Sequence, residues 1–176
     1  MTSKRVIIYP DGDPDEHPAL AQAGIDRLSA YGTLRVHHGS PESNEDYLSR
    51  ITDANALIVG WSLPADVMAN APQLELITFT GTGAHDYIDL PAAQAQGITV
   101  CNCPGYADTA VAEHAFALLL GTARNLAQLD RKMRESVWDQ DTPGIGLAGK
   151  QLGLIGFGGM AMGTWLQGNL NAEYGF

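Results

Sequence analysis

A glycine-rich turn has the residue spacing most suggestive of ligand chemistry in this sequence. An apolar run, predicted to be a strand over Leu152–Phe157, leads into Gly156, Gly158 and Ala161. In dinucleotide-binding folds the first glycine makes a tight turn, the second lets the backbone approach a pyrophosphate, and the third small residue lets the next helix pack closely. The free N–H groups of that helix then face the phosphates. The spacing predicts a nucleotide phosphate site, although a plain strand-to-helix turn satisfies the same pattern.

A second glycine-rich loop, Gly81-Thr82-Gly83, follows a strand predicted over Leu74–Phe79. Parallel sheets bind ligands in the crevice at the carboxyl ends of their strands. Backbone N–H groups in such a loop can hold a carboxylate, and the hydroxyl of Thr82 adds a further polar group. The loop is therefore predicted to bind a ligand, the alternative being an ordinary connection that contains glycines.

Several other polar side chains do not assemble into a site. Asp11 and Asp13 follow the first predicted strand, as in a magnesium-binding phospho-receiver domain. That domain needs an aspartate closing the third strand and a lysine closing the fifth, where this sequence has Gly60-Trp61 and Cys103-Pro104. We therefore interpret the two aspartates as part of a solvated loop. The histidines form no catalytic or metal-binding set, and His85 lies nearest to a ligand-type loop; they are His17, His37, His38, His85 and His114.

Composition and the cysteines restrict the class of protein. The formal net charge of −10 argues against a nucleic acid or an anionic membrane as partner, because both require clustered Lys and Arg. No apolar run is long enough to span a bilayer. Cys101 and Cys103 alternate along a predicted strand and point the same way, which suits neither a disulfide nor a metal site. We interpret them as reduced core residues of a soluble, cytoplasmic protein without a metal.

Strands and helices alternate along the first 103 residues. This alternation predicts an α/β fold, a doubly wound parallel sheet with right-handed crossovers. The predicted strands are 5–9, 33–37, 56–60, 74–79 and 98–103, and the helices between them are 18–31, 45–51, 65–69 and 90–96. A long amphipathic helix is predicted next, over about Thr109 to Glu135, with basic residues near its C-terminal end. Residues 138–150 contain Pro143 and several glycines and are predicted to be a linker.

Several stretches together resemble the D-isomer-specific 2-hydroxyacid dehydrogenase family. They occur in the family's order over about residues 50 to 161, which is more specific than any single motif. The matching stretches are Ala71-Pro-Gln-Leu-Glu-Leu-Ile77, Gly81-Thr-Gly83 with Ile88-Asp-Leu90, Gly97-Ile-Thr-Val-Cys-Asn-Cys-Pro-Gly105, Val111-Ala-Glu-His-Ala115, and Gly149-Lys150 leading into Leu152-Gly-Leu-Ile-Gly-Phe-Gly158.

The resemblance implies a domain organisation and a function. Residues 1–105 would form a flavodoxin-like substrate-binding domain, residues 106–136 a long helix between domains and at a homodimer contact, and residues 137–176 the incomplete start of an NAD-binding Rossmann domain. The activity would be hydride transfer between NAD, or NADP, and a small 2-hydroxy or 2-keto acid. The implied cofactor contacts are Thr82, Gly156, Gly158, Gly159, Met160 and Ala161, and the implied substrate contacts are Trp61, Ser62 and Gly83.

Departures from the family pattern are also informative. The family's catalytic arginine, glutamate and histidine would lie beyond residue 176, so no catalytic residue is assigned and the chain alone is expected to be inactive. It would be an N-terminal portion, truncated or a fragment, that binds NAD weakly. Asp108 stands where many members have asparagine. We expect residues 137–176 to be mobile or docked on another chain. A non-catalytic module that senses a small molecule or nucleotide remains the alternative function.

Overall fold

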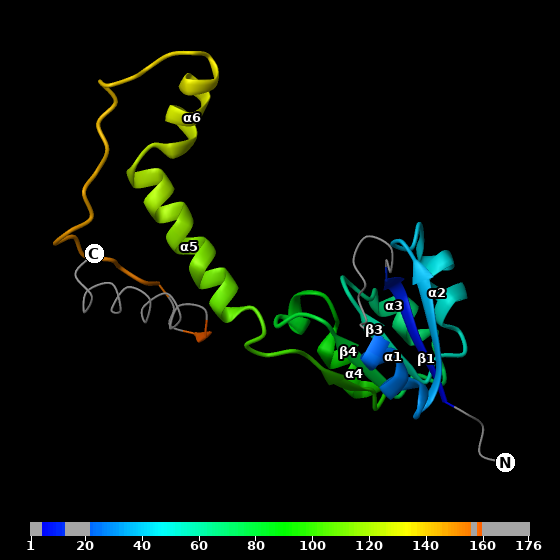
Figure 1. The fold of residues 1–176 in the computed structure, drawn as a ribbon. Helices are drawn as coiled ribbons and strands as arrows, with labels where there is room; N and C mark the ends of the chain where they lie inside the picture. Colours follow the sequence, from blue (N-terminus) through cyan, green and yellow to red (C-terminus); the bar gives the residue numbers. More distant parts are fainter. Residues whose placement is uncertain (1–4, 13–21, 156–157, 160–176) are drawn as a thin grey trace. The chain divides into compact units, whose positions relative to one another are not determined.

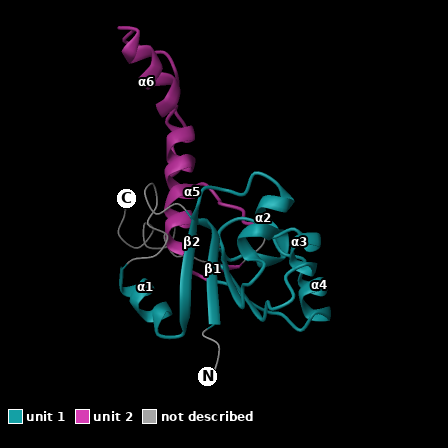
Figure 2. Ribbon diagram, turned by 90° about the vertical axis from the view of Figure 1, so that its right-hand side faces the viewer, with its two compact units in different colours: residues 1–104 teal, residues 105–176 magenta. Residues whose placement is uncertain are grey.

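The computed structural model describes residues 5–12, 22–155, 158 and 159. The chain divides into two compact units, residues 1–104 and residues 105–176 (Figures 1 and 2). Unit 1 contains the sheet and the helices that cover it, and unit 2 contains the helices that follow. Each unit is described by itself.

The sheet of unit 1 is parallel throughout. Its five strands lie in the order β2-β1-β3-β4-β5. They are β1 (Arg5–Gly12), β2 (Gly32–His38), β3 (Ala56–Val59), β4 (Leu76–Phe79) and β5 (Thr99–Cys101). This is the flavodoxin-like order, which confirms the α/β doubly wound fold predicted from the sequence.

Helices lie on both faces of the sheet. In Figure 2, α2, α3 and α4 lie on one side of the strands and α1 lies on the other. They are α1 (Gln22–Ser29), α2 (Asn44–Ile51), α3 (Ala65–Ala69) and α4 (Leu90–Ala95), with a 3₁₀ turn, η1 (Ala84–Asp86), before α4. Side-chain caps define the starts of two helices, because Ser43 accepts from the N–H of Asp46 and Asp89 accepts from the N–H of Ala92. The first part of the helix predicted over 18–31 lies outside the described residues.

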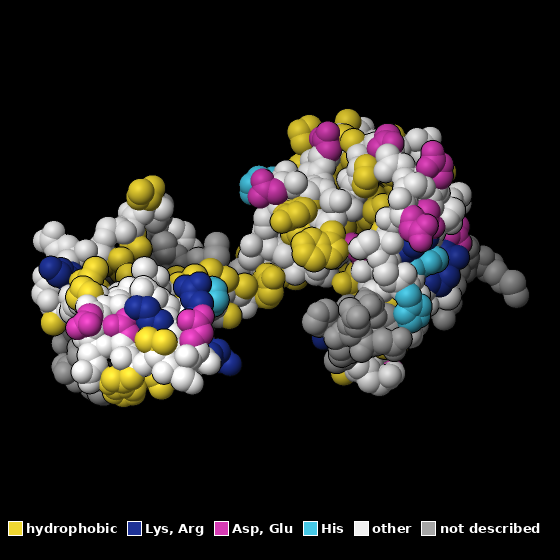
Figure 3. Space-filling model, turned by 90° about the horizontal axis from the view of Figure 1, so that it is seen from above, with side chains coloured by type: hydrophobic (Ala, Val, Ile, Leu, Met, Phe, Trp, Pro, Cys, Tyr) yellow, Lys and Arg dark blue, Asp and Glu magenta, His cyan; other side chains and the backbone are white. Residues whose placement is uncertain are grey.

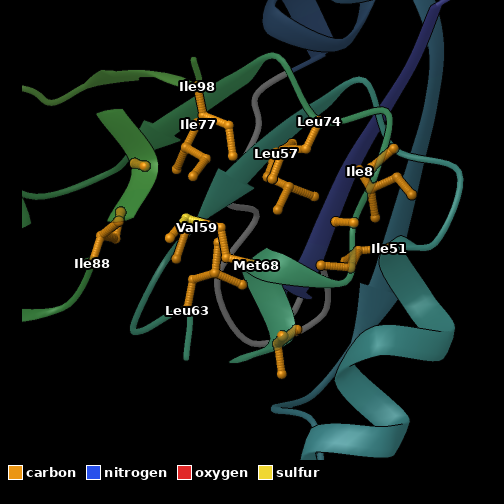
Figure 4. Packing of buried hydrophobic residues seen from close by; sticks show 14 of the residues in the cluster. Ile8, Ile51, Leu57, Val59, Leu63, Met68, Leu74, Ile77, Ile88 and Ile98 are labelled. Carbon is orange, nitrogen blue, oxygen red and sulfur yellow. The ribbon is translucent and has the colours of Figure 1, made fainter. Parts of the chain in front are cut away.

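The main core lies between the sheet and α2, α3 and α4. Strand side chains such as Ile8, Leu57 and Ile77 meet helix side chains such as Ile51 and Met68, all of them 1% exposed or less (Figure 4). A smaller cluster covers the other face, where Ile7, Tyr9 and Ile58 are buried. The central strand β1 is therefore buried on both faces, as its apolar run predicts.

Strand β1 continues past the proline that was expected to end it. Pro10 is buried within the strand, and the pairing with β2 shifts register between Tyr9 and Gly12. A proline cannot donate to the ladder, and an irregularity of this kind accommodates it. The prediction that the strand ends at Tyr9 was wrong for this reason, and Asp11 consequently belongs to the strand.

Strand β5 lies at the edge of the sheet, and this changes the interpretation of the cysteines. Both are free thiols, but Cys101 is exposed and Cys103 is only half-buried. Their assignment as core residues was wrong. The pattern of apolar residues along an edge strand resembles that of a central strand. Only the elements packed against the strand decide which of its faces is covered.

Among its described residues, unit 2 has two helices over the range in which one continuous helix was predicted. These are α5 (Asp108–Ala123) and α6 (Leu126–Arg134), and they are separated at Asn125, which has a left-handed backbone with φ of 54°. Asparagine adopts this conformation more readily than most residues. The side-chain amide of Asn125 donates to the carbonyl of Pro143 at 2.7 Å, and the N–H of Ile145 donates to the carbonyl of Ala123 at 2.7 Å. The returning chain thus takes the Ala123 carbonyl, which a continuous helix would use for its own hydrogen bond.

The described part of the segment after α6 contains a polar clasp, a group of hydrogen bonds centred on Asp139. It contains no strand. The carboxylate of Asp139 accepts hydrogen bonds from the Lys132 ammonium and the Thr142 hydroxyl. Further on, Leu152–Ile155 has no regular secondary structure, and Gly156 and Phe157 lie outside the described residues. The predicted strand is not formed over its described part, because a strand needs a neighbour for its backbone hydrogen bonds and unit 2 has no strand among its described residues. None of the described helices is long and apolar enough to cross a bilayer.

Candidate functional site

The carboxyl ends of β1 and β3 form the point at which the strand order reverses. From β1 the chain passes to β2 on one side, and from β2 it returns across β1 to β3 on the other. In doubly wound folds this switch point opens a crevice that ligands occupy. The residues that follow each strand here are Asp11 in β1 and Gly60-Trp61 after β3.

Asp11 spans this switch point with its carboxylate. It accepts a hydrogen bond from the N–H of Gly60, 3.1 Å from each carboxylate oxygen, and another from the N–H of Trp61 at 2.9 Å. Burial raises the pKa of the Asp11 carboxyl above its usual value, while the two N–H groups and the charge of Arg50 oppose that rise. The interpretation of Asp11 as a solvated loop residue was therefore wrong. Asp13 lies outside the described residues.

The Trp61–Ser62 segment is presented between two anchors. On one side the N–H of Trp61 is held by Asp11, and on the other the N–H of Leu63 donates to the carbonyl of Tyr87 at 3.1 Å. Leu63 also forms an isolated parallel bridge with Ile88 and is 2% exposed. The indole of Trp61, by contrast, is 67% exposed. Trp61 and Ser62, two of the predicted substrate contacts, therefore lie on a short segment that hydrogen bonds hold at both ends.

The Gly81-Thr82-Gly83 loop lies at the carboxyl end of β4 and is tied to β5. The side-chain amide of Asn102 donates to the carbonyl of Thr82 at 2.6 Å, and the N–H of Cys103 donates to the carbonyl of Gly81 at 2.9 Å. A side chain on Gly81 would begin 2.5 Å from the ring of Phe79, so the close approach of loop and ring requires glycine there. Thr82 itself is exposed.

An aromatic contact links the loop after β3, which contains Trp61 and Ser62, to the loop after β4, which contains Thr82 and Gly83. Phe79, at the end of β4, stacks on Tyr87 with ring centroids 5.1 Å apart, and the carbonyl of Tyr87 holds Leu63. The structure thus brings Trp61, Ser62, Thr82 and Gly83 to the same edge of the sheet, in the loops that follow β3 and β4.

Two hollows flank these loops. One, of about 330 Å³, lies between the Trp61–Ser62 segment and the loop before α2. Its lining mixes polar and apolar side chains and carries no cation among the described residues; it comprises Asp11, Ser40, Pro41, Glu42, Ser43, Asn44, Tyr47, Trp61, Ser62 and Pro64. The other, of about 180 Å³, lies beside Thr82 and Asn102. Both are large enough for part of a small polar molecule.

The residues of the predicted dinucleotide turn are only partly described. Gly156, Met160 and Ala161 lie outside the described residues. A side chain on Gly158 would meet no described atom within 4 Å, so on that side its backbone is open to a ligand. A side chain on Gly159 would collide with the carboxylate of Asp108, which therefore lies against the Gly159 backbone. The open backbone suits a phosphate, and the carboxylate would have to turn away to admit one.

Histidine contributes little to this edge of the sheet. His85 is exposed, with its Nε2 atom 3.5 Å from a carboxylate oxygen of Asp86. His37 lies on β2, and burial together with the charges of Arg50 and Arg35 lowers its pKa. Among the described residues, no group of three or more His, Cys, Asp or Glu side chains could hold a metal ion.

Sequence reasoning missed two residues of this edge. Asp11 was set aside with the acidic loop, and Asn102 was read only as part of a strand-like run. One signal could have identified both, since each is a polar residue at the carboxyl end of a strand, where parallel sheets bind ligands. The partner that each residue holds is a backbone group about 20 or 50 positions away, which no local pattern can indicate.

Comparisons with known sequences point to one family. The family model described as D-isomer specific 2-hydroxyacid dehydrogenase, catalytic domain, matches residues 9–165. The D-3-phosphoglycerate dehydrogenase of Methanocaldococcus jannaschii is 37% identical over 142 residues, covering 79% of this chain and 26% of that protein. The glyoxylate reductase of Thermofilum pendens is 32% identical over 154 residues, covering 82% of this chain and 45% of that protein. The chain thus spans less than half the length of either relative.

A solved structure of similar fold agrees with these matches. The NADPH-dependent glyoxylate/hydroxypyruvate reductase of Sinorhizobium meliloti, in complex with NADP and malonate, gives a TM-score of 0.74 at 25% sequence identity. The match covers 96% of this chain and 51% of that protein. With the family model matching most of its length, the chain belongs to the D-isomer specific 2-hydroxyacid dehydrogenase family, as the sequence resemblance indicated.

Proposed function

We propose that this chain is the N-terminal part of a nicotinamide-dependent oxidoreductase that interconverts small 2-hydroxy and 2-keto acids. The observation that carries the proposal is the convergence of two ligand-type loops at the carboxyl edge of a flavodoxin-like sheet, in a chain of this family. The relatives support the substrate class, since they are named for D-3-phosphoglycerate and glyoxylate, which are 2-hydroxy and 2-keto acids respectively.

The substrate carboxylate is assigned to the Trp61–Ser62 segment and to Gly83. The backbone N–H of Trp61 already donates to Asp11, so the donors of this segment without a hydrogen-bond partner among the described residues are the N–H and hydroxyl of Ser62 and the indole N–H of Trp61. The exposed indole of Trp61 can cover the apolar part of a small acid. Gly83 offers its backbone at the end of the neighbouring loop. Together these groups bind and orient the acid.

The cofactor is assigned to Thr82 and to the glycine-rich turn. Gly156 and Ala161 would shape the turn, and the N–H groups of Gly158, Gly159 and Met160 would hold the pyrophosphate after the Asp108 side chain turns away. When bound, the nicotinamide supplies or accepts the hydride at C2 of the acid. The sequence resemblance favours NAD, and NADP is the alternative, which the NADPH dependence of the Sinorhizobium meliloti relative supports.

The remaining parts of the proposal concern the whole protein. The catalytic arginine, glutamate and histidine are assigned to sequence beyond residue 176, so this chain is expected to be inactive by itself. Residues 1–105, 106–136 and 137–176 are proposed as the substrate domain, the connecting region and the start of the cofactor domain, in a cytoplasmic homodimer. The alternative of a non-catalytic sensing module is not favoured, because the family model extends from residue 9 to residue 165.

A chimera provides the test. Residues 1–145 of this chain would replace the matching part of the Sinorhizobium meliloti reductase, and oxidation of NADH and NADPH would be followed with glyoxylate, hydroxypyruvate and pyruvate. We expect no activity from this chain alone and activity from the chimera. Ser62→Ala should lower kcat/KM roughly tenfold or more, the effect of losing a hydrogen bond to a charged group. The exposed control Ser29→Ala should have no effect. A folded chimera that reduces none of these acids would contradict the proposal.

A further inference from the structure

The carboxyl ends of β1 and β3 are not joined by backbone hydrogen bonds. The two strands pair at Ile7 with Ala56 and at Ile8 with Leu57, and the described pairing goes no further. Pro10 follows, has no N–H to donate, and lies where β1 shifts register against β2. On its other side, β3 remains paired with β4 up to Val59 and Phe79. The sheet thus opens at the switch point, and side chains must bridge the gap.

The Asp11 carboxylate makes that bridge in a space built for it. Its oxygens lie 2.9 to 3.1 Å from the nitrogens of Gly60 and Trp61. A side chain on Gly60 would begin 3.2 Å from the Tyr9 hydroxyl and 3.4 Å from an Asp11 oxygen, so little room remains there. Behind the strand, the Arg50 guanidinium donates to the carbonyl of Pro10 at 2.7 Å and also to Asp46. Arg50 therefore supports the backbone next to Asp11 and is itself paired.

This bridge controls one end of a two-residue segment. Beyond Trp61 and Ser62 the chain is held again at Leu63, by the carbonyl of Tyr87. We propose that Asp11 is a positioning residue for the substrate loop: acting through the N–H groups of Gly60 and Trp61, its carboxylate sets the direction in which Trp61 and Ser62 meet the ligand. This inference rests on the proposed function of that loop.

Polar groups from three elements surround the Asp11 carboxylate. The groups that face it are Tyr9 on β1, Tyr47 and Arg50 on α2, and the two loop N–H groups. Burial raises the pKa of the carboxyl above 3.8 despite the opposing hydrogen bonds. A raised folded pKa means that this group contributes full stability below 3.8 and loses that contribution as the pH rises through the folded pKa.

Amide NMR on this chain tests the inference with Asp11→Asn, Asp11→Ala and the control Asp53→Asn. Asp53 is an exposed carboxylate that pairs with Arg35 in the same unit. In Asp11→Ala the N–H groups of Gly60 and Trp61 should exchange with solvent roughly tenfold faster or more, with Asp11→Asn between it and the wild type because one acceptor oxygen remains. Amides of the buried Leu57 and Ile77 should not change. In the wild type, the Gly60 and Trp61 amide shifts should titrate together with a midpoint above 3.8, and Asp11→Asn should abolish this.

Titration with pyruvate completes the test. Wild type and Asp53→Asn should show the same shift changes at Ser62 and Gly83, and Asp11→Ala should need roughly tenfold more pyruvate for them. If Asp11→Ala does not fold, Asp11→Asn serves in its place. Unchanged exchange at Gly60 and Trp61, or an unchanged pyruvate response, would overturn the positioning role alone. No pyruvate response at Ser62 in the wild type would overturn the proposed function of the loop, and this inference with it.

Discussion

The two units of the chain bury their apolar side chains to very different extents. Unit 1 encloses a continuous cluster under the sheet, in which Leu57 is 1% exposed and Met68 is fully buried. In unit 2, Ala112 and Ala123 are the buried residues among those described, while Leu118 and Leu126 are each 58% exposed. Figure 3 shows hydrophobic side chains interspersed with charged ones over the surface of unit 2.

This difference shows where the stability of the chain resides. Burying a leucine side chain contributes about 1.5–3 kcal/mol, and unit 1 collects many such contributions around its sheet. The helices α5 and α6 of unit 2 are held by their own hydrogen bonds and by the returning chain at Asn125. Exposed apolar helices of this kind commonly mark an interaction surface. The first unit is therefore expected to fold independently, and the second to need a partner surface.

A matched pair of leucine substitutions gives the largest contrast. Leu57→Ala removes side-chain atoms from the core of unit 1 and should lower the free energy of unfolding by about 3 kcal/mol. Leu118→Ala acts at an exposed site of unit 2 and should change it by about 0.5 kcal/mol or less. Urea unfolding followed by circular dichroism measures both. Similar effects for the two variants would mean that α5 is covered by another surface.

The homodimer proposal predicts the next contrast. If α5 and α6 contact a second copy, Leu118→Lys combined with Leu126→Lys should weaken self-association roughly tenfold or more, because charges would be buried in an apolar contact. Tyr31→Lys alters a large exposed hydrophobic side chain in unit 1 and serves as the control. Sedimentation over a range of concentrations measures the dissociation constant. A loss of association in the control alone would place the contact on unit 1.

The clasp after α6 should give the smallest and most local effect. The Lys132 ammonium, helped by the Thr142 hydroxyl and the Asp141 N–H, holds the pKa of Asp139 well below 3.8. A lowered folded pKa gives a contribution that is present above 3.8 and lost as the pH falls through the folded value. Asp139→Asn should therefore speed amide exchange of Asp141 and Thr142 at neutral pH and leave unit 1 unchanged. In the wild type that protection should persist to about pH 4; an earlier loss would contradict the assigned pairing.

Most of unit 1 could be predicted from its sequence. Apolar runs such as Ala56–Val59 and amphipathic stretches such as Asn44–Ile51 match the period of a strand or a helix, and their alternation permits few topologies. The prediction failed at Pro10 and at Asn125. Pro10 was expected to end its strand, but pairing with β2 continues past it. In unit 2 one helix was expected to continue through Asn125, where the chain instead leaves the helix and the Asn125 side chain donates to Pro143.

The candidate site likewise contains residues that could be predicted from the sequence and residues that could not. The Gly81-Thr82-Gly83 loop could be predicted because glycine after a buried strand is a local pattern, and the family resemblance marked Trp61 and Ser62. Asp11 could not be assigned, since its role depends on N–H groups that lie about 50 positions along the chain. The exposure of Cys101 was likewise unpredictable, because it follows from β5 being an edge strand.

The sequence by itself determined the types of the elements in unit 1, the parallel sheet and the family, because these depend on short-range periodicity and on motifs in order. Only the tertiary structure decided that β1 and β3 separate at their carboxyl ends and that Asp11 bridges them to hold the Trp61–Ser62 segment. The physical reason is the sequence separation over which each kind of interaction acts. Helix and strand signals arise between residues a few positions apart, whereas a carboxylate spanning two strands depends on chain packing that no local pattern records.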